Sequence, residues 1–242
     1  MDTLNMRTGG EGEPAILFLH GLGATGAVWA HLTELVPRRV LVPDLPGHGP
    51  SAPLPHYSFE TLATAVARAL PGNGPLVVAG HSLGGVLALE LASGKYDVEV
   101  EGVLALGVKV EWTQDDLGRA ASFAARPPRV FETQPEADQA YLKVSGLLGI
   151  APADPAGLRE TEGGWRLAMD PAAFGVGAPD MPALLAAARC PVVLAAGEND
   201  PMSRPEQLRA LDPAAVTLAG LGHNAHVEDP AAVRALLERF GV

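Results

Sequence analysis

A serine set between an apolar run and a helix-like stretch constrains the fold of this chain more than any other feature. The run at 76–79 predicts a buried strand, and 85–92 predicts a helix. The pentapeptide GHSLG at 80–84 joins them, so the chain must turn sharply there. Glycines two positions on either side of Ser82 leave room for strained backbone angles at the serine. The pattern predicts a nucleophile elbow that presents the Ser82 hydroxyl at a sheet edge.

Two residues further along the chain supply the groups that such a serine needs. A serine hydroxyl is a poor nucleophile at neutral pH, so it requires a base, and the base requires an orienting acid. Apolar runs at 191–196 and 215–219 predict strands that end close to Asp200 and His223. Because sites form at the carboxyl ends of parallel strands, we expect these side chains to meet Ser82. We predict His223 as the base and Asp200 as the acid.

Other side chains compete for these roles. Glu198 lies in the same loop as Asp200, and Glu111 follows the preceding strand, so either could be the acid. His226, three residues after His223, could be the base or could form a metal pair with it. A metal site needs three or more ligands and no third one is apparent. We therefore expect no metal, and no cofactor.

A turn after the first apolar strand suggests how an oxyanion would be stabilised. The run at 15–19 leads into the sequence HGLG at 20–23. We expect the backbone N–H groups of Leu22 and Leu83 to be the two oxyanion donors. We expect the His20 ring to hold its loop by hydrogen bonds rather than to transfer protons.

Taken together, these motifs resemble those of the α/β-hydrolase superfamily. They run in the family's order and span residues 15–240, so the resemblance covers nearly the whole chain. The matching segments are 20–23, 44–51, 80–85, 197–201 and 222–230. The resemblance implies a serine esterase-like protein with an α/β-hydrolase fold and a helical cap.

Alternating strand and helix signals predict a mostly parallel central sheet with helices on both faces. Strands are expected near 15–20, 39–43, 75–80, 101–106, 191–196 and 214–219. Helices are expected near 26–36, 58–70, 83–94, 204–210 and 230–240. The N-terminal hairpin of the family is expected to be shortened to one strand around Thr3 to Thr8.

Residues 108–187 interrupt this alternation. The stretch is too long for a bare loop and holds six of the twelve aromatic residues. We therefore divide the chain into an α/β-hydrolase core, 1–107 and 188–242, and a helical cap or lid, 108–187.

A cap over the serine would form an apolar pocket and exclude water. We expect His81, Trp112 and Phe174 to contact the substrate. We also expect little fixed positive charge near the elbow, where Val86 stands.

Net charge and cysteine content restrict the partners and the cellular compartment that we expect for this chain. The formal net charge of −11 argues against nucleic acid or an anionic membrane as a partner. Cys190 is the only cysteine, so no intrachain disulfide can form, and we expect a reducing, cytoplasmic setting. The N-terminus has no signal-peptide pattern, and no run of 18 apolar residues could span a membrane. Oligomeric state leaves no sign in the sequence.

The predicted reaction is hydrolysis of a small-to-medium carboxylic ester, or a related thioester or lactone, through an acyl-enzyme. Two alternatives remain. The tail at 222–230 is similar to menaquinone-pathway synthases that eliminate pyruvate, but those enzymes have an arginine where this chain has Val86. A protein that binds a ligand on the same fold without catalysis is the other alternative.

Overall fold

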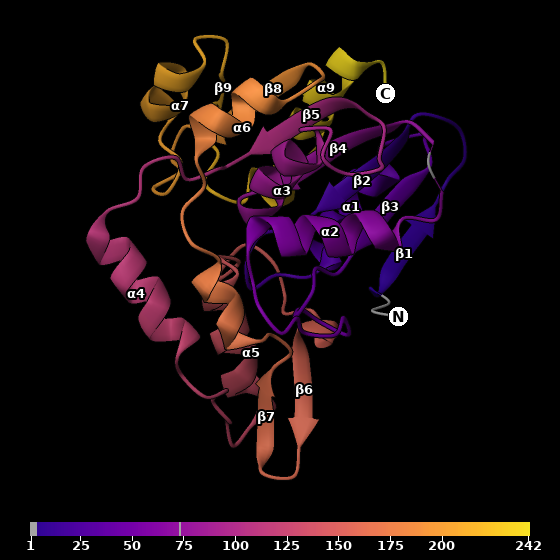
Figure 1. Ribbon diagram of the computed structural model, residues 1–242. Coiled ribbons are helices and arrows are strands. Elements are labelled where there is room, and N and C mark those ends of the chain that lie inside the picture. The colour runs from indigo at the N-terminus through magenta and orange to yellow at the C-terminus, as the bar shows by residue number, and fades with distance from the viewer. Residues whose placement is uncertain (1–3, 73) are drawn as a thin grey trace.

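The computed structural model describes residues 4–72 and 74–242. A twisted seven-stranded sheet forms its centre, with helices on both faces (Figure 1). The strand order is β1-β3-β2-β4-β5-β8-β9; β1 runs antiparallel to β3, and the other pairs are parallel. The strands are β1 (Met6–Gly9), β2 (Ala15–Leu19), β3 (Val40–Pro43), β4 (Leu76–His81), β5 (Val100–Leu106), β8 (Val192–Gly197) and β9 (Val216–Leu218).

Each face of the sheet has its own hydrophobic core. In β2, Leu17 and Leu19 belong to one core while Ile16 and Phe18 belong to the other, because successive strand side chains point to opposite faces. The first core packs under α2 (Phe59–Ala69), α3 (Leu83–Leu91), α6 (Met181–Ala187) and α7 (Pro205–Leu211). The second packs under η1 (Gly26–Trp29), α1 (Ala30–Glu34), α8 (Ala225–Glu228) and α9 (Pro230–Leu237), which η4 (Glu238–Phe240) extends.

The expected α/β architecture is confirmed, with local differences. The helix expected at 26–36 is divided into a 3-10 turn and the short α1. The single N-terminal strand is present as β1; Thr3, where we expected it to start, lies outside the described residues. The one-turn helix α8 was not expected. No helix in the described part of the chain has the length and apolar character needed to cross a membrane.

Most of the segment between β5 and β8 forms a lobe below the sheet in Figure 1, whereas its last helix, α6, lies against the sheet beside α3. The segment holds α4 (Gln114–Ala124), α5 (Gln134–Val144), η2 (Pro155–Gly157), β6 (Leu158–Thr161), β7 (Gly164–Leu167) and η3 (Pro171–Val176), and it ends in α6. A small core of its own includes Phe131, Tyr141 and Leu158. Helices were expected here, but the antiparallel hairpin of β6 and β7 was not.

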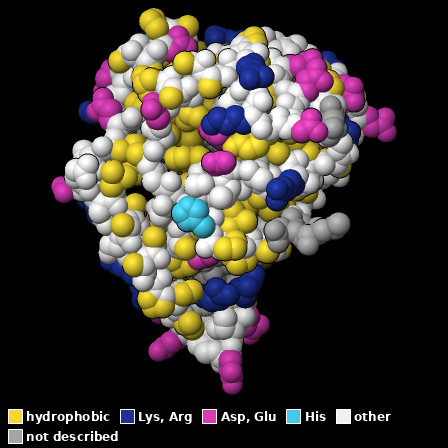
Figure 2. All heavy atoms as spheres, in the orientation of Figure 1, with side chains coloured by type: hydrophobic (Ala, Val, Ile, Leu, Met, Phe, Trp, Pro, Cys, Tyr) yellow, Lys and Arg dark blue, Asp and Glu magenta, His cyan; other side chains and the backbone are white. Residues whose placement is uncertain are grey.

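Helix α4 packs on η3 of this lobe without burying any of its own side chains. Phe123, which contacts Phe174 of η3 at a ring-centroid distance of 5.3 Å, is 44% exposed. Figure 2 shows a hollow between α4 and the rest of the molecule, with hydrophobic side chains around it. The lobe therefore leaves apolar surface open to solvent beside α4.

Candidate active site

The serine turn has the strained geometry that its glycines predict. Ser82 has φ 51° and ψ −112°, and it is the only non-glycine residue with positive φ in the described part of the chain. A Cβ at position 80 would lie 2.0 Å from the Gly84 carbonyl oxygen, and one at position 84 would lie 2.1 Å from that of Leu19. Only glycine fits at either place. The strain persists because strand β4 and helix α3 hold both sides of the turn.

Asp200 and His223 meet at the carboxyl ends of β8 and β9. The Nδ1 atom of His223 lies 2.8 Å from Oδ2 of Asp200, and because an ionised carboxylate only accepts, Nδ1 carries the proton. The other oxygen, Oδ1, accepts from the N–H groups of Met202 (2.8 Å) and Ser203 (3.0 Å). The Asp200 side chain is fully buried and that of His223 is 17% exposed. This arrangement leaves Nε2 of His223 unprotonated and able to act as a base.

A cavity of about 250 Å³ brings the expected site residues together. Both Ser82 and His223 line it, although no hydrogen bond joins their side chains among the described residues. Such contacts between catalytic groups often tighten only with substrate bound. The cavity is also lined by the other residues expected at the site, which are Leu22, His81, Leu83, Trp112 and Phe174.

The amides expected to hold an oxyanion are free to do so. Leu83 is the first residue of α3, where backbone N–H groups have no intrahelical acceptor. Within the described residues, neither its N–H nor that of Leu22 donates to a backbone or side-chain oxygen. Two such donors at one cavity could stabilise the negative oxygen of a tetrahedral intermediate.

His20 braces the loop that carries one of these amides. Its Nε2 accepts from the Leu45 N–H at 2.8 Å, so the proton lies on Nδ1, which donates to the Gly21 carbonyl at 2.8 Å. His48 supports the same loop by accepting from the Gly23 N–H at 3.1 Å. Both nitrogens of His20 are occupied, which agrees with a structural role.

His81 and His226 lie behind the proposed base. The Nε2–H of His81 donates to the backbone carbonyl of His223 at 2.9 Å. The His226 ring packs between those of Trp29 and His81, at centroid distances of 4.3 and 4.4 Å. Neither ring nitrogen of His226 has a hydrogen-bond partner in the described structure. The loop itself is braced by Glu228, whose carboxylate accepts from Gly222 N–H at 2.7 Å.

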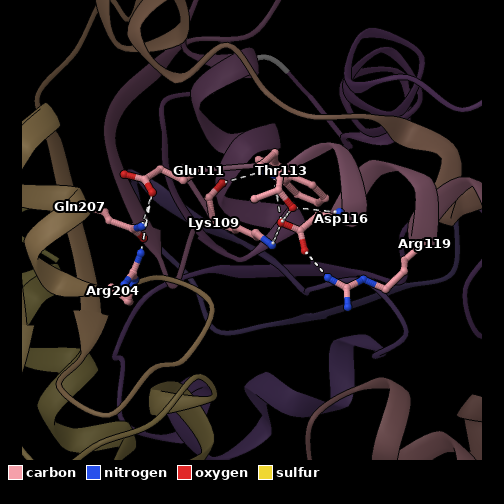
Figure 3. A network of polar contacts seen from close by, with 8 residues as sticks. Lys109, Glu111, Thr113, Asp116, Arg119, Arg204 and Gln207 are labelled. Carbon is pink, nitrogen blue, oxygen red and sulfur yellow. Dashed lines mark hydrogen bonds and ion pairs between the residues drawn. The ribbon is translucent and has the colours of Figure 1, made fainter.

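The two rival acids do not reach the imidazole of His223. The carboxylate of Glu198 accepts from the Gly220 N–H at 2.8 Å. Figure 3 shows Glu111 turned towards α7, where it is 2.6 Å from Gln207 and 3.7 Å from Arg204. Asp200 is therefore the acid that the geometry supports.

The expectation of little positive charge near the serine was wrong. Lys109 and Lys143 line the cavity, and no Asp or Glu in the described residues does so. In Figure 3, the Lys109 ammonium points to Asp116, with Nζ 2.8 Å from Oδ2. Val86 gave no indication of these lysines, because both lie at distant positions in the sequence, within residues 108–187.

Further lining residues were missed because nothing in the sequence marks them. They are Phe59, Val144, Ser145, Gly146, Val176 and Met202, among others. No group of three or more His, Cys, Asp or Glu side chains in the described chain is arranged to hold a metal ion.

We predict that stability falls on mild acidification. Burial lowers the pKa of His20 to about 4 and that of His48 and His226 to about 3. Between these values and 6.5 the unfolded chain binds protons that the folded chain does not, so the free energy of unfolding decreases as pH falls through this window. At pH 5 the free energy of unfolding should be lower than at neutral pH by about 2 kcal/mol for each of these three histidines.

Urea unfolding at about pH 7.5 and about pH 5 would measure this loss. His226→Phe should remove about 2 kcal/mol of the difference, whereas a change at the exposed His56 should not. Equal free energies at the two pH values would contradict the prediction.

Comparison with known proteins gives a family and a fold. Residues 16–236 match the model of the alpha/beta hydrolase family. The chain is 36% identical to lipase LipV of Mycobacterium tuberculosis over 94 residues, which cover 38% of this chain and 36% of the lipase. It is 34% identical to 2-succinyl-6-hydroxy-2,4-cyclohexadiene-1-carboxylate synthase of Yersinia enterocolitica over 110 residues, 44% of this chain and 40% of the synthase. The chain thus spans less than half the length of these curated relatives.

A crystal structure of E-2-(acetamidomethylene)succinate hydrolase superposes on the chain with a TM-score of 0.80. The match covers 98% of this chain and 94% of that one at 24% identity. At this identity the likeness shows the shared fold alone.

Proposed function

We propose that this chain, which belongs to the alpha/beta hydrolase family, is a serine hydrolase of small-to-medium carboxylic esters or of related thioesters or lactones. One observation carries the proposal: the imidazole of His223, held by Asp200, lines the same cavity as Ser82 at its strained turn. The lipase among the relatives supports the same reaction class.

The geometry supports a two-step acyl transfer. Nε2 of His223 takes the proton of Ser82, whose Oγ attacks the ester carbonyl. The N–H groups of Leu22 and Leu83 stabilise the oxyanion, each by roughly 2.7–4 kcal/mol. His223 then protonates the leaving alcohol, and a water that His223 deprotonates releases the acid and restores Ser82. Asp200 holds the imidazole in the required tautomer throughout.

Residues 108–187 are proposed to act as a cap that selects the substrate. Trp112 and Phe174, which come from this segment, line the cavity together with Ser82. The cavity of about 250 Å³ lies just below the range of roughly 300–1,000 Å³ that is usual for ligand pockets. This size favours short and medium acyl groups.

Trp112→Ala is expected to shift chain-length preference towards longer acyl groups. The change enlarges the cavity wall, and one methylene in an apolar pocket is worth roughly 1–3 kcal/mol, so the octanoate-to-butyrate ratio of kcat/KM should rise about tenfold. Trp165→Ala serves as the control, because Trp165 packs against the small core of the lobe and does not line the cavity. Preferences that respond equally to both changes would argue against Trp112 as a wall residue.

The acid can be identified by comparing two carboxylates. Asp200→Asn should lower kcat by about 10⁴, because the amide favours the wrong imidazole tautomer. Glu111→Gln should have a small effect, since Glu111 contacts Gln207 and Arg204 on the surface. Steady-state kinetics on a p-nitrophenyl ester would decide; a larger loss at Glu111 would reassign the acid.

A panel of p-nitrophenyl esters from acetate to decanoate tests the proposal as a whole. Turnover above the buffer rate, with a maximum among short and medium chains, is expected. Absence of turnover with every ester would favour the ligand-binding alternative. Val86 argues against the alternative function as a pyruvate-eliminating lyase, because the synthases that catalyse that reaction have an arginine at this position.

A further inference from the structure

The cavity around Ser82 is unusually basic for this chain. The sequence has 28 acidic residues against 17 Lys and Arg, and only three of the latter are lysines. Two of the three, Lys109 and Lys143, line the cavity, while no described Asp or Glu does. The charge of the cavity is therefore opposite to the net charge of −11.

Lys109 follows β5, and its positive charge is partly neutralised by a neighbouring carboxylate. Its ammonium forms an ion pair with Asp116 at 2.8 Å (Figure 3). It also lies 4.9 Å from the centre of the Trp112 ring. Asp116 is also bound by the backbone and hydroxyl of Thr113 and by Arg119. Because an ammonium has three N–H donors, Lys109 can bind a second anion while it keeps its contact with Asp116.

Lys143 also lines the cavity and lies in the last turn of α5. No carboxylate of the described residues lies within 4.0 Å of its ammonium. Its neighbour Val144 packs against Gly23 of the oxyanion loop, where an added Cβ would come within 2.4 Å of Val144 Cγ1. A cation near a helix C-terminus is ordinary, but that role does not require a place at the wall of this cavity.

We propose that the substrate carries a carboxylate a few bonds from its ester group, and that Lys143, assisted by Lys109, binds it. This inference rests on the proposed function. An anionic substrate approaching a chain of net charge −11 is repelled at long range, so binding requires local cations at the site. Charge-assisted hydrogen bonds from lysine to carboxylate supply the attraction.

Two pairs of isosteric esters test the proposal and show which side of the ester carries the carboxylate. On the acyl side, monomethyl glutarate is compared with methyl 5-methylhexanoate, in which an isopropyl group replaces the carboxylate. On the alcohol side, carboxymethyl butyrate is compared with isobutyl butyrate. In at least one pair, kcat/KM for the charged ester should exceed that for its isostere by about tenfold or more.

Lys143→Met should reduce this charged-to-neutral ratio about tenfold, and Lys109→Met should reduce it less, because Asp116 already shares that charge. Lys95→Met is the matched control, since Lys95 pairs with Glu90 and does not line the cavity. Raising NaCl to about 0.5 M should lower the ratio by screening. A ratio near one in both pairs, or a ratio that neither cavity lysine changes, would overturn the proposal.

Binding separates this inference from the proposed function. In Ser82→Ala, calorimetry with monomethyl glutarate should show binding that Lys143→Met weakens about tenfold. If the parent protein cleaved no ester while Ser82→Ala showed this binding, the carboxylate site would be upheld and the hydrolase rejected. Ester cleavage without charge preference would do the reverse, and absence of binding in Ser82→Ala would count against the carboxylate site.

Discussion

Replacing Ser82 by alanine should abolish ester hydrolysis and leave the fold intact. Loss of the nucleophile from a serine triad costs about 10⁶ in kcat in a well-studied protease. The fold should survive because alanine and serine bear the same Cβ, so the strain at φ 51° is unchanged. Circular dichroism and thermal unfolding would confirm the fold, and steady-state kinetics the loss.

A serine-directed fluorophosphonate gives a second readout of the same change. The probe should label the parent protein at one site and fail to label Ser82→Ala. Ser145 is the matched control, because it also lines the cavity but its hydroxyl donates to the Tyr141 carbonyl at 2.8 Å. Ser145→Ala should keep the label. A label retained in Ser82→Ala would show that another residue is the nucleophile.

Sequence reasoning succeeded where local chemistry dictates structure. Gly80 and Gly84 are required because a Cβ at either position would lie only 2.0 or 2.1 Å from a backbone carbonyl oxygen. The turn can therefore be inferred without knowing the rest of the fold. The strands are short apolar runs between turn residues, which also makes the parallel sheet predictable. Asp200 and His223 follow two such strands, and the sheet places their ends together.

Prediction from the sequence failed where the position of a side chain depends on how one segment packs on another. Lys109 and Lys143 lie 34 positions apart, and Lys143 reaches the cavity only through the packing of α5, which the sequence does not show. Nor did the sequence indicate that α4 would leave all of its side chains at least partly exposed. His81 was expected to contact substrate, and the structure adds a hydrogen bond to the His223 carbonyl that joins residues 142 positions apart.

The second large effect distinguishes two histidines of one loop. His223→Ala should lower kcat by about 10⁶, because removing the base of a triad costs about as much as removing the nucleophile. His226→Ala should lower kcat far less, since its ring packs between Trp29 and His81 and its nitrogens form no hydrogen bond within the described residues. Its effect should instead fall on stability, because an unfilled space would remain beside Trp29.

Kinetics and thermal unfolding on both variants would therefore separate catalysis from packing. His223→Ala should keep its melting temperature within a few degrees while activity disappears. The His223 side chain is partly exposed, and among the described residues its one side-chain hydrogen bond is to Asp200. His226→Phe, which fills the space beside Trp29, should recover part of the stability that His226→Ala loses. If activity fell more at His226 than at His223, the base would be His226, and the hydrogen bond between Asp200 and His223 would have to be structural.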